Sequence, residues 1–246
     1  MNAMILAAGK GTRLQSLTEA MPKPMLPIGG RPVLEYIVRW MGFHGVRKMA
    51  INVHFQGDII QRHFGDGSAC GVSITFSPEP ELLGTAGGVK KMEPFFDEVF
   101  LVAYGDVLSD LDVRALLAFH AAHGPQPHAT LVVDPRPDAT QCGVVEIGDD
   151  ERVRGFIEKP PPGQIRSRWV NSGIMVLDRP LLADVPPGQV CDFGRDILPA
   201  WLEAGVPLWA WKLPPGHYLI DMGTPSNYER ACREWPQRAA RWMGPV

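Results

Sequence analysis

The feature that most constrains the fold is a regular alternation of short apolar runs with stretches of helical periodicity in the first half of the chain. The apolar runs have the length of buried strands, and the segments between them carry apolar residues at helical spacing. Because strands that alternate with helices are typical of a parallel sheet covered on both faces, we expect an α/β fold. The expected strands cover residues 4–8, 49–53, 72–76 and 99–104, and the expected helices cover residues 32–41, 56–64, 85–92 and 112–123.

Beyond residue 128 this rhythm changes, and strands follow one another with few helices between them. Strands are expected at 129–133, 143–147, 153–157 and 169–177, and helices return at 192–204 and 225–235. We interpret residues 1–232 as one domain, made of a half over 1–125 and a mixed half over 126–232 that share one sheet. Residues 233–246 are expected to form a C-terminal helix or tail. No internal repeat, including the hexapeptide type, is present.

Composition excludes several classes of protein. The formal net charge of −3 over 246 residues leaves no basic surface of the kind that binds nucleic acid or an anionic membrane. The four cysteines have no zinc or redox spacing, and neither a signal peptide nor a membrane span is evident, so a cytoplasmic protein is expected. His120 and His123 lie three residues apart with no third metal ligand at matching spacing, and we expect them at the surface or at a helix end.

A glycine-rich loop directly follows the first expected strand. Small residues in the run Leu6–Leu14 (LAAGKGTRL) let the backbone approach a nucleotide, and consecutive N–H groups can bind phosphate. Arg13 adds a cationic fork for phosphate oxygens. The run lacks the Gly-Lys-Ser/Thr of a P-loop and the third glycine of the dinucleotide fingerprint. Taken alone, it is either a phosphate-binding loop or a structural turn.

A lysine between two prolines is the second informative feature. In Pro22-Lys23-Pro24 the flanking rings restrict the backbone and therefore the positions that the Lys23 ammonium can reach. Such a restricted cation suits a phosphate clamp. The alternative is a solvated lysine in a proline-rich surface turn.

Together these motifs resemble the sugar-1-phosphate nucleotidyltransferases, also called nucleoside-diphosphate-sugar pyrophosphorylases. The likeness rests on LAAGKGTRL followed by PKPMLPIGGRP at 22–32, and it continues in order to about residue 230. The later motifs are Leu83–Gly88, Gly105-Asp106, Gly143–Val145, Glu158–Pro160, Asn171–Gly173 and Asp221–Pro225. The resemblance implies the family's Rossmann-like three-layer sandwich with a mostly parallel mixed sheet, in which 1–125 binds the nucleotide and 126–232 the sugar phosphate. No left-handed β-helix domain follows, so the functions of that domain are not expected.

The resemblance also implies a reaction and a set of site residues. Such enzymes let a phosphate oxygen of a sugar 1-phosphate attack the α-phosphorus of a nucleoside triphosphate in line, which releases pyrophosphate. Arg13 and Lys23 would hold the triphosphate and the departing pyrophosphate, and Lys159 would neutralise the sugar phosphate; these three are the expected catalytic residues. The residues expected to bind the nucleotide are Leu6, Ala7, Ala8, Gly9, Gly11, Thr12, Arg13, Lys23, Glu79, Gly84 and Thr85.

The remaining expected site residues bind the sugar and a metal ion. Gly143, Glu158, Lys159 and Asn171 would contact the sugar phosphate, although Asn171 also suits an ordinary turn. Asp106 and Asp221 would hold Mg²⁺, because two carboxylates together with substrate phosphates match its ligand preference. An isolated Gly-Asp pair would otherwise be interpreted as a turn cap.

The sequence gives less direct evidence about which nucleotide and which sugar phosphate are the substrates. A carboxylate at Glu79 or Glu81 can accept from both N1–H and N2–H of guanine, which favours GTP. The overall likeness is to mannose-1-phosphate guanylyltransferases and their short heptose-1-phosphate relatives, so GTP and mannose 1-phosphate are the first choice of substrates. The alternatives are UTP or dTTP with a glucose or amino-sugar 1-phosphate, a phosphocholine cytidylyltransferase, and a non-catalytic nucleotide-sugar sensor. A homo-oligomer is an expectation by analogy alone.

Overall fold

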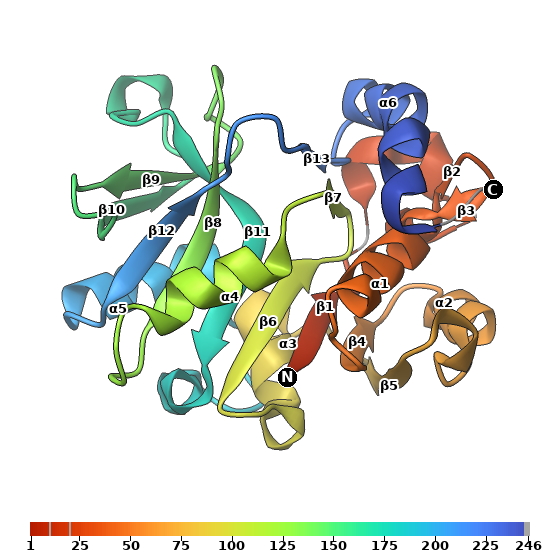
Figure 1. Cartoon of the computed structure of the whole chain (residues 1–246), viewed down its shortest axis with the longest axis horizontal. Helices are drawn as coiled ribbons and strands as arrows, with labels where there is room; N and C mark the ends of the chain where they lie inside the picture. Colours follow the sequence, from red (N-terminus) through yellow and green to blue (C-terminus); the bar gives the residue numbers. More distant parts are fainter. Residues whose placement is uncertain (10, 20, 244–246) are drawn as a thin grey trace. The chain divides into compact units, whose positions relative to one another are not determined.

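In the computed structural model, which describes residues 1–9, 11–19 and 21–243, the chain passes more than once between two structural units (Figure 1). Unit 1 contains Met1–Leu82, Ala103–Val113 and Gly216–Val246, and unit 2 contains Leu83–Val102 and Arg114–Pro215. The sequence predicts two halves that meet at residue 125. The units instead interleave, because the segments that carry Asp106 and Asp221 return to the N-terminal part of the chain.

Three parallel strands organise unit 1, in the order β1 (Asn2–Leu6), β4 (Lys48–Val53) and β5 (Ser73–Pro78). Leu6 pairs with Asn52, and Asn52 pairs with Ser77, so the carboxyl ends of the strands lie at the same level. These strands were predicted from their apolar runs. The first ends at Leu6 rather than at Ala8, which leaves Ala7 and Ala8 in the loop that follows.

The helices of unit 1 are α1 (Val33–Phe43), α2 (Gly57–Phe64) and α6 (Pro225–Met243). Helix α6 is longer than the predicted 225–235. It continues past Pro236 because Ala231, Trp235 and Ala239, spaced four residues apart, keep one face buried. The Trp235 ring meets the Tyr36 ring of α1 edge-on, with centroids 6.0 Å apart.

Two small antiparallel pairs of strands in unit 1 were not predicted. One joins β2 (Pro27–Ile28) to β3 (Arg31–Pro32). The other joins β7 (Val107–Ser109) to β13 (Leu219–Asp221), where Asp221 pairs with Val107. The second pair brings Asp221 next to the residue that follows Asp106.

Unit 2 has a mixed arrangement of strands. The strand β11 (Trp169–Asp178) is antiparallel to β8 (Ala129–Pro135) and to β9 (Gly143–Ile147), β9 is antiparallel to β10 (Val153–Glu158), and β12 (Leu208–Lys212) is parallel to β8. Of these strands, β12 was not predicted. The predicted helix 192–204 is a π-helical turn over Phe193–Ile197 that continues into α5 (Leu198–Glu203). Unit 2 also contains α3 (Gly84–Lys91) and most of α4 (Val113–Ala121), while β6 (Val99–Tyr104) continues from unit 2 into unit 1.

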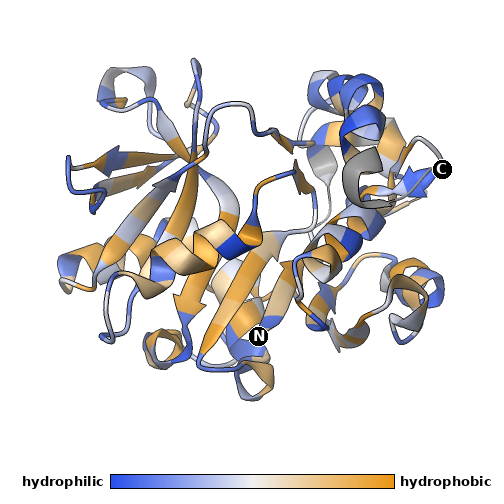
Figure 2. Ribbon diagram, viewed as in Figure 1, coloured by the Kyte–Doolittle hydropathy of each residue, from blue (hydrophilic) through white to orange (hydrophobic). Residues whose placement is uncertain are grey.

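The predicted α/β class is confirmed by this combination of parallel and mixed strands with covering helices. Figure 2 shows that β6 (Val99–Tyr104) and β8 (Ala129–Pro135) carry mainly hydrophobic residues, whereas the coloured part of α6 is largely hydrophilic. Across residues 1–9, 11–19 and 21–243, no helix combines the length and the apolarity that crossing a bilayer requires.

A buried carboxylate in α1 gives unit 1 a pH-dependent contribution to stability. Glu35 is 7% exposed; its Oε1 accepts from Arg31 and Arg39 at 2.8 Å each, and its Oε2 lies 3.0 Å from Nε2 of His63. Burial alone raises the pKa of Glu35, but the hydrogen bonds from Arg39, His63 and Arg31 together lower it below its ordinary value of 4.5. The ionised form therefore stabilises the fold above that value, and this stability is lost as the pH falls through the lower pKa of the folded state.

We expect Glu35→Gln to lower the free energy of unfolding at pH 7 by about 1–3 kcal/mol, because charge-assisted hydrogen bonds are lost. The difference between the two proteins should shrink as the pH falls below about 4.5, where the unfolded carboxyl takes up its proton. Urea unfolding over a pH series measures both. Asp58→Asn, which alters only an exposed ion pair with Arg62, is the matched control and should change stability little. A difference for Glu35→Gln that is independent of pH would contradict this assignment.

Candidate active site

The loop after β1 is held by two hydrogen bonds from neighbouring segments. The backbone N–H of Ala7 donates to Oδ1 of Asn52 at 2.7 Å, and the N–H of Gly105 donates to the carbonyl of Leu6 at 2.8 Å. A Cβ on Gly105 would lie 3.0 Å from that carbonyl oxygen, so glycine permits the close approach. The loop is therefore fixed at its start, as close approach to a ligand requires.

Asn52 was not among the predicted site residues. Its Nδ2 donates to Oε1 of Glu79 at 2.8 Å, and both side chains are buried, at 3% and 2% exposed. Because a carboxylate only accepts, Glu79 orients the Asn52 amide so that its oxygen faces the Ala7 N–H. Glu79 was predicted to bind the nucleotide. In the structure, the Glu79 side chain is connected to the loop after β1 by the hydrogen bonds of Asn52. Glu81 is exposed. The signal in the sequence that could have identified this position is the polar residue Asn52 within the apolar run at 49–53.

Lys23 lies between two carboxylates. Its Nζ forms an ion pair with Asp106 and lies 3.6 Å from Oδ1 of Asp221. The Lys23 side chain is 8% exposed, so the ammonium is largely removed from water. The proline-flanked turn Lys23–Met25 and the β7–β13 pair position these three groups.

Burial and the nearby negative charge of Asp106 raise the pKa of Asp221, while Lys23 and Arg13 oppose this shift. Two carboxylates that repel each other and converge on one cation are a donor set suited to a hard divalent ion. The residues present therefore fit Mg²⁺, which would bind Asp106 and Asp221.

A pocket of about 250 Å³ lies beside these groups in unit 1. It is lined mainly by residues that the sequence predicts for nucleotide, catalytic or metal sites. The side chain of Thr12 lies outside the described residues, and the Thr12 backbone begins a 3₁₀ helix after Gly11, whose φ is +64°. The lining residues are Leu6, Ala7, Gly9, Gly11, Arg13, Lys23, Pro24, Asp106 and Gly223.

The predicted sugar-phosphate residues lie in unit 2. Gly143 of β9 pairs with Glu158 of β10, and a Cβ on Gly143 would lie 2.9 Å from Oε2 of Glu158 and 2.4 Å from the Phe156 ring. Lys159 has a positive φ of 48°, which is unusual for a residue with a side chain, and its Nζ lies 3.4 Å from Oε1 of Glu158. Strain of this kind is common at functional sites.

The other predicted residues of unit 2 make local contacts. Asn171, at an irregularity of β11, accepts the N–H of Gly173 at 3.2 Å. Thr85 donates to Asp192 at 2.8 Å and accepts the N–H of Phe193, and a Cβ on Gly84 would lie 2.4 Å from the Cys191 carbonyl oxygen. Gly84 and Thr85 thus hold the segment 191–193 in place.

This is an α/β fold in which a glycine-rich loop follows the first parallel strand and lies beside a lysine and two carboxylates, an arrangement suited to binding phosphate. The family can be named from the sequence as a whole. The model of the nucleotidyl transferase family matches residues 2–238, and the chain belongs to this family.

The curated relatives are named for different substrates. The chain is 34% identical, over 95% of its length, to the UTP–glucose-1-phosphate uridylyltransferase of Synechocystis sp., and 33% identical, over 95%, to the mannose-1-phosphate guanylyltransferase of Mycobacterium tuberculosis. It spans 63% and 64% of the lengths of these two relatives. It is also 29% identical to the D-glycero-alpha-D-manno-heptose 1-phosphate guanylyltransferase of Aneurinibacillus thermoaerophilus, with 95% of this chain and 98% of that protein covered.

Among solved structures, the chain resembles the HddC protein of Yersinia pseudotuberculosis complexed with GMP-PN, with a TM-score of 0.80 and 26% sequence identity. The match covers 95% of this chain and 99% of that one. It agrees with the fold class that the sequence predicts.

Proposed function

We propose that this chain transfers a nucleotidyl group from a nucleoside triphosphate to a sugar 1-phosphate and releases pyrophosphate. The observation that carries the proposal is the pocket of unit 1, where the glycine-rich loop and Arg13 adjoin Lys23 and Asp106. A triphosphate needs backbone N–H groups and cations at close quarters, and this pocket offers both.

In the proposed reaction, a phosphate oxygen of the sugar 1-phosphate forms a bond to the α-phosphorus while the bond to the bridging oxygen of the pyrophosphate breaks. The attacking oxygen is already anionic and pyrophosphate leaves as an anion, so the step needs no general base or acid. Arg13 and Lys23 would bind the triphosphate and stabilise the departing pyrophosphate, and Lys159 would neutralise the sugar phosphate. Mg²⁺, held by Asp106 and Asp221, would add charge neutralisation at the phosphates.

Within this class, GTP and mannose 1-phosphate are the proposed first substrates. The relatives from M. tuberculosis and A. thermoaerophilus, both named guanylyltransferases, support GTP, and so does the resemblance to a protein complexed with GMP-PN. UTP with glucose 1-phosphate is the second candidate, favoured by the 34% identity to the Synechocystis uridylyltransferase.

Pyrophosphate release tests the proposal. The purified protein with Mg²⁺ is assayed with GTP, UTP, dTTP, CTP and ATP, each against mannose, glucose, heptose and amino-sugar 1-phosphates and phosphocholine. We expect release only when GTP and mannose 1-phosphate are present together. Release with UTP and glucose 1-phosphate would support the second candidate, and release with CTP and phosphocholine would overturn the sugar assignment. Absence of release with every pair would contradict the transferase proposal.

Asn52 should affect this activity without touching the reacting groups. Asn52→Ala removes the acceptor of the Ala7 N–H and the donor to Glu79, so the loop after β1 loses its anchor. We expect kcat/KM for the triphosphate to fall roughly 10- to 100-fold, because displacement of a positioning loop by about 1 Å has effects of this size. Steady-state kinetics measures this.

The matched control is Gln61→Ala, an exposed position on α2, which should leave kcat/KM unchanged. A circular dichroism spectrum and an unfolding midpoint show whether Asn52→Ala still folds. Unchanged kinetics in a folded Asn52→Ala protein would contradict the positioning role.

A further inference from the structure

We propose that His120, His128 and Asp178 form a binding site for a divalent transition-metal ion of the zinc class. The three residues belong to unit 2, whereas all residues that line the pocket belong to unit 1. Two imidazoles and a carboxylate are a donor set that Zn²⁺ binds in proteins, and they offer ligand atoms within 4.8 Å of one another. The proposal is independent of the nucleotidyltransferase function.

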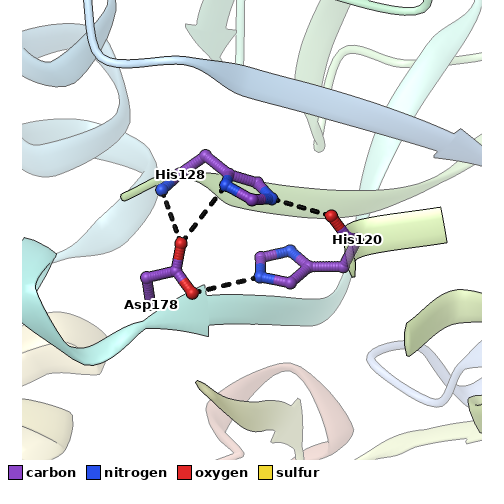
Figure 3. Close-up of side chains that lie close together, drawn as sticks. All are labelled: His120, His128 and Asp178. Carbon is purple, nitrogen blue, oxygen red and sulfur yellow. Dashed lines mark hydrogen bonds and ion pairs between the residues drawn. The ribbon is translucent and has the colours of Figure 1, made fainter. Parts of the chain in front are cut away.

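The carboxylate of Asp178 presents one oxygen to each ring (Figure 3). Its Oδ1 lies 3.3 Å from Nε2 of His120, and its Oδ2 lies 3.2 Å from Nδ1 of His128. In a tetrahedral site with bonds of about 2.0–2.1 Å, neighbouring ligand atoms lie roughly 3.3 Å apart. These two nitrogen–oxygen distances are close to the spacing of neighbouring ligands around one ion.

Each histidine has a partner on its other ring nitrogen. Nδ1 of His120 lies 2.9 Å from Oγ1 of Thr130, and Nε2 of His128 lies 2.9 Å from the carbonyl oxygen of His120. Metal-binding histidines usually donate their second N–H to such an oxygen, which fixes the tautomer and the orientation of the ring. The remaining ring nitrogens, Nε2 of His120 and Nδ1 of His128, face Asp178.

Burial keeps these groups away from competing water. His120 and His128 are each 3% exposed, and the Asp178 side chain is 16% exposed. Nδ1 of His128 also lies 2.7 Å from the carbonyl oxygen of Gln126, a contact that a metal ion bound at Nδ1 would replace.

The ion would join segments that are distant in sequence. His120 lies in the last turn of α4, His128 precedes β8, and Asp178 ends β11. A ligand that binds only the folded state stabilises it according to its concentration, so the site would strengthen unit 2.

Cobalt binding tests the proposal, with the full chain freed of metal by a chelator. We expect one equivalent of Co²⁺ to give the visible absorption of a four- or five-coordinate ion with nitrogen ligands. Oxygen-only octahedral sites absorb very weakly, so this readout is separate from the proposed Mg²⁺ site. We further expect Zn²⁺ at about 100 times its Kd to raise the unfolding midpoint by roughly 5–10 °C.

His128→Gln and Asp178→Asn should each abolish the cobalt spectrum and the zinc-dependent shift. Two controls should keep both: His123→Gln, whose ring centroid lies 6.3 Å from that of His128, and Asp106→Asn in the pocket. If either His128→Gln or Asp178→Asn does not fold, the visible spectrum of the wild-type protein with Co²⁺ tests the proposal. A wild-type protein without the absorption band, or a band that persists in folded His128→Gln, would overturn the proposal.

Discussion

Replacing Lys23 by methionine is expected to lower kcat/KM for the nucleoside triphosphate by about 10²–10³-fold, with most of the loss in kcat. Methionine keeps an unbranched apolar stem in this buried position but removes the ammonium that pairs with Asp106 and lies 3.6 Å from Asp221. The departing pyrophosphate then loses a cation that stabilises its charge in the transition state, and losses of one such group are typically of this size. Pyrophosphate release under steady-state conditions measures the change.

Lys48→Met is the matched control, because Lys48 is exposed at the start of β4. It should leave kcat/KM unaltered. The unfolding midpoint of Lys23→Met must also be measured, since removal of one member of a buried ion pair leaves charge uncompensated. A folded Lys23→Met protein with wild-type kcat/KM would rule out the clamp role of this lysine.

Asp106→Asn is expected to lower kcat by about 10²–10³-fold and to abolish saturation by Mg²⁺ in the wild-type concentration range. Asparagine preserves the shape of the side chain, and the backbone contact from the Met222 N–H to the Asp106 carbonyl does not depend on the carboxylate. What is lost is the negative charge that would bind the metal together with Asp221. A titration of activity against Mg²⁺ measures both effects.

Asp149→Asn, an exposed position in unit 2, serves as the comparison and should show the wild-type Mg²⁺ dependence. Nucleotide binding by Asp106→Asn should be followed in parallel. A non-catalytic sensor would retain binding and show no Mg²⁺-dependent turnover even as wild type. Full Mg²⁺-dependent turnover in Asp106→Asn would contradict the metal assignment.

Local patterns predicted the longer elements well. The apolar run at 99–104 forms β6 and the run at 143–147 forms β9, each with the predicted bounds. Such runs are long enough for their spacing to report burial on one or both faces. The three-residue strands β7 and β13 were missed, because so short a segment has no periodicity and forms only through its distant partner.

The glycine-rich loop, Arg13 and the proline-flanked Lys23 could be identified from the sequence, since each motif consists of neighbouring residues. Their role as a phosphate site stays a prediction. The resemblance implied that Asp106 and Asp221 lie together as metal ligands, but their convergence on Lys23 was not predicted, and it depends on the β7–β13 pair. Asn52 was not found at all. Its importance lies in hydrogen bonds to Ala7 and Glu79, which are far from it in sequence.

The histidines of unit 2 illustrate the same limit. His120 lies in the last turn of α4, as expected, but it is buried rather than at the surface. The sequence spacing showed no third metal ligand beside the histidines. In the structure, β11 places Asp178 close to His120 and His128. The sequence by itself determined the α/β class, the glycine-rich loop after the first strand and the family, because these depend on local spacing and ordered motifs. Only the tertiary structure decided which buried polar groups meet, because such contacts form between strands and loops that fold together from distant parts of the chain.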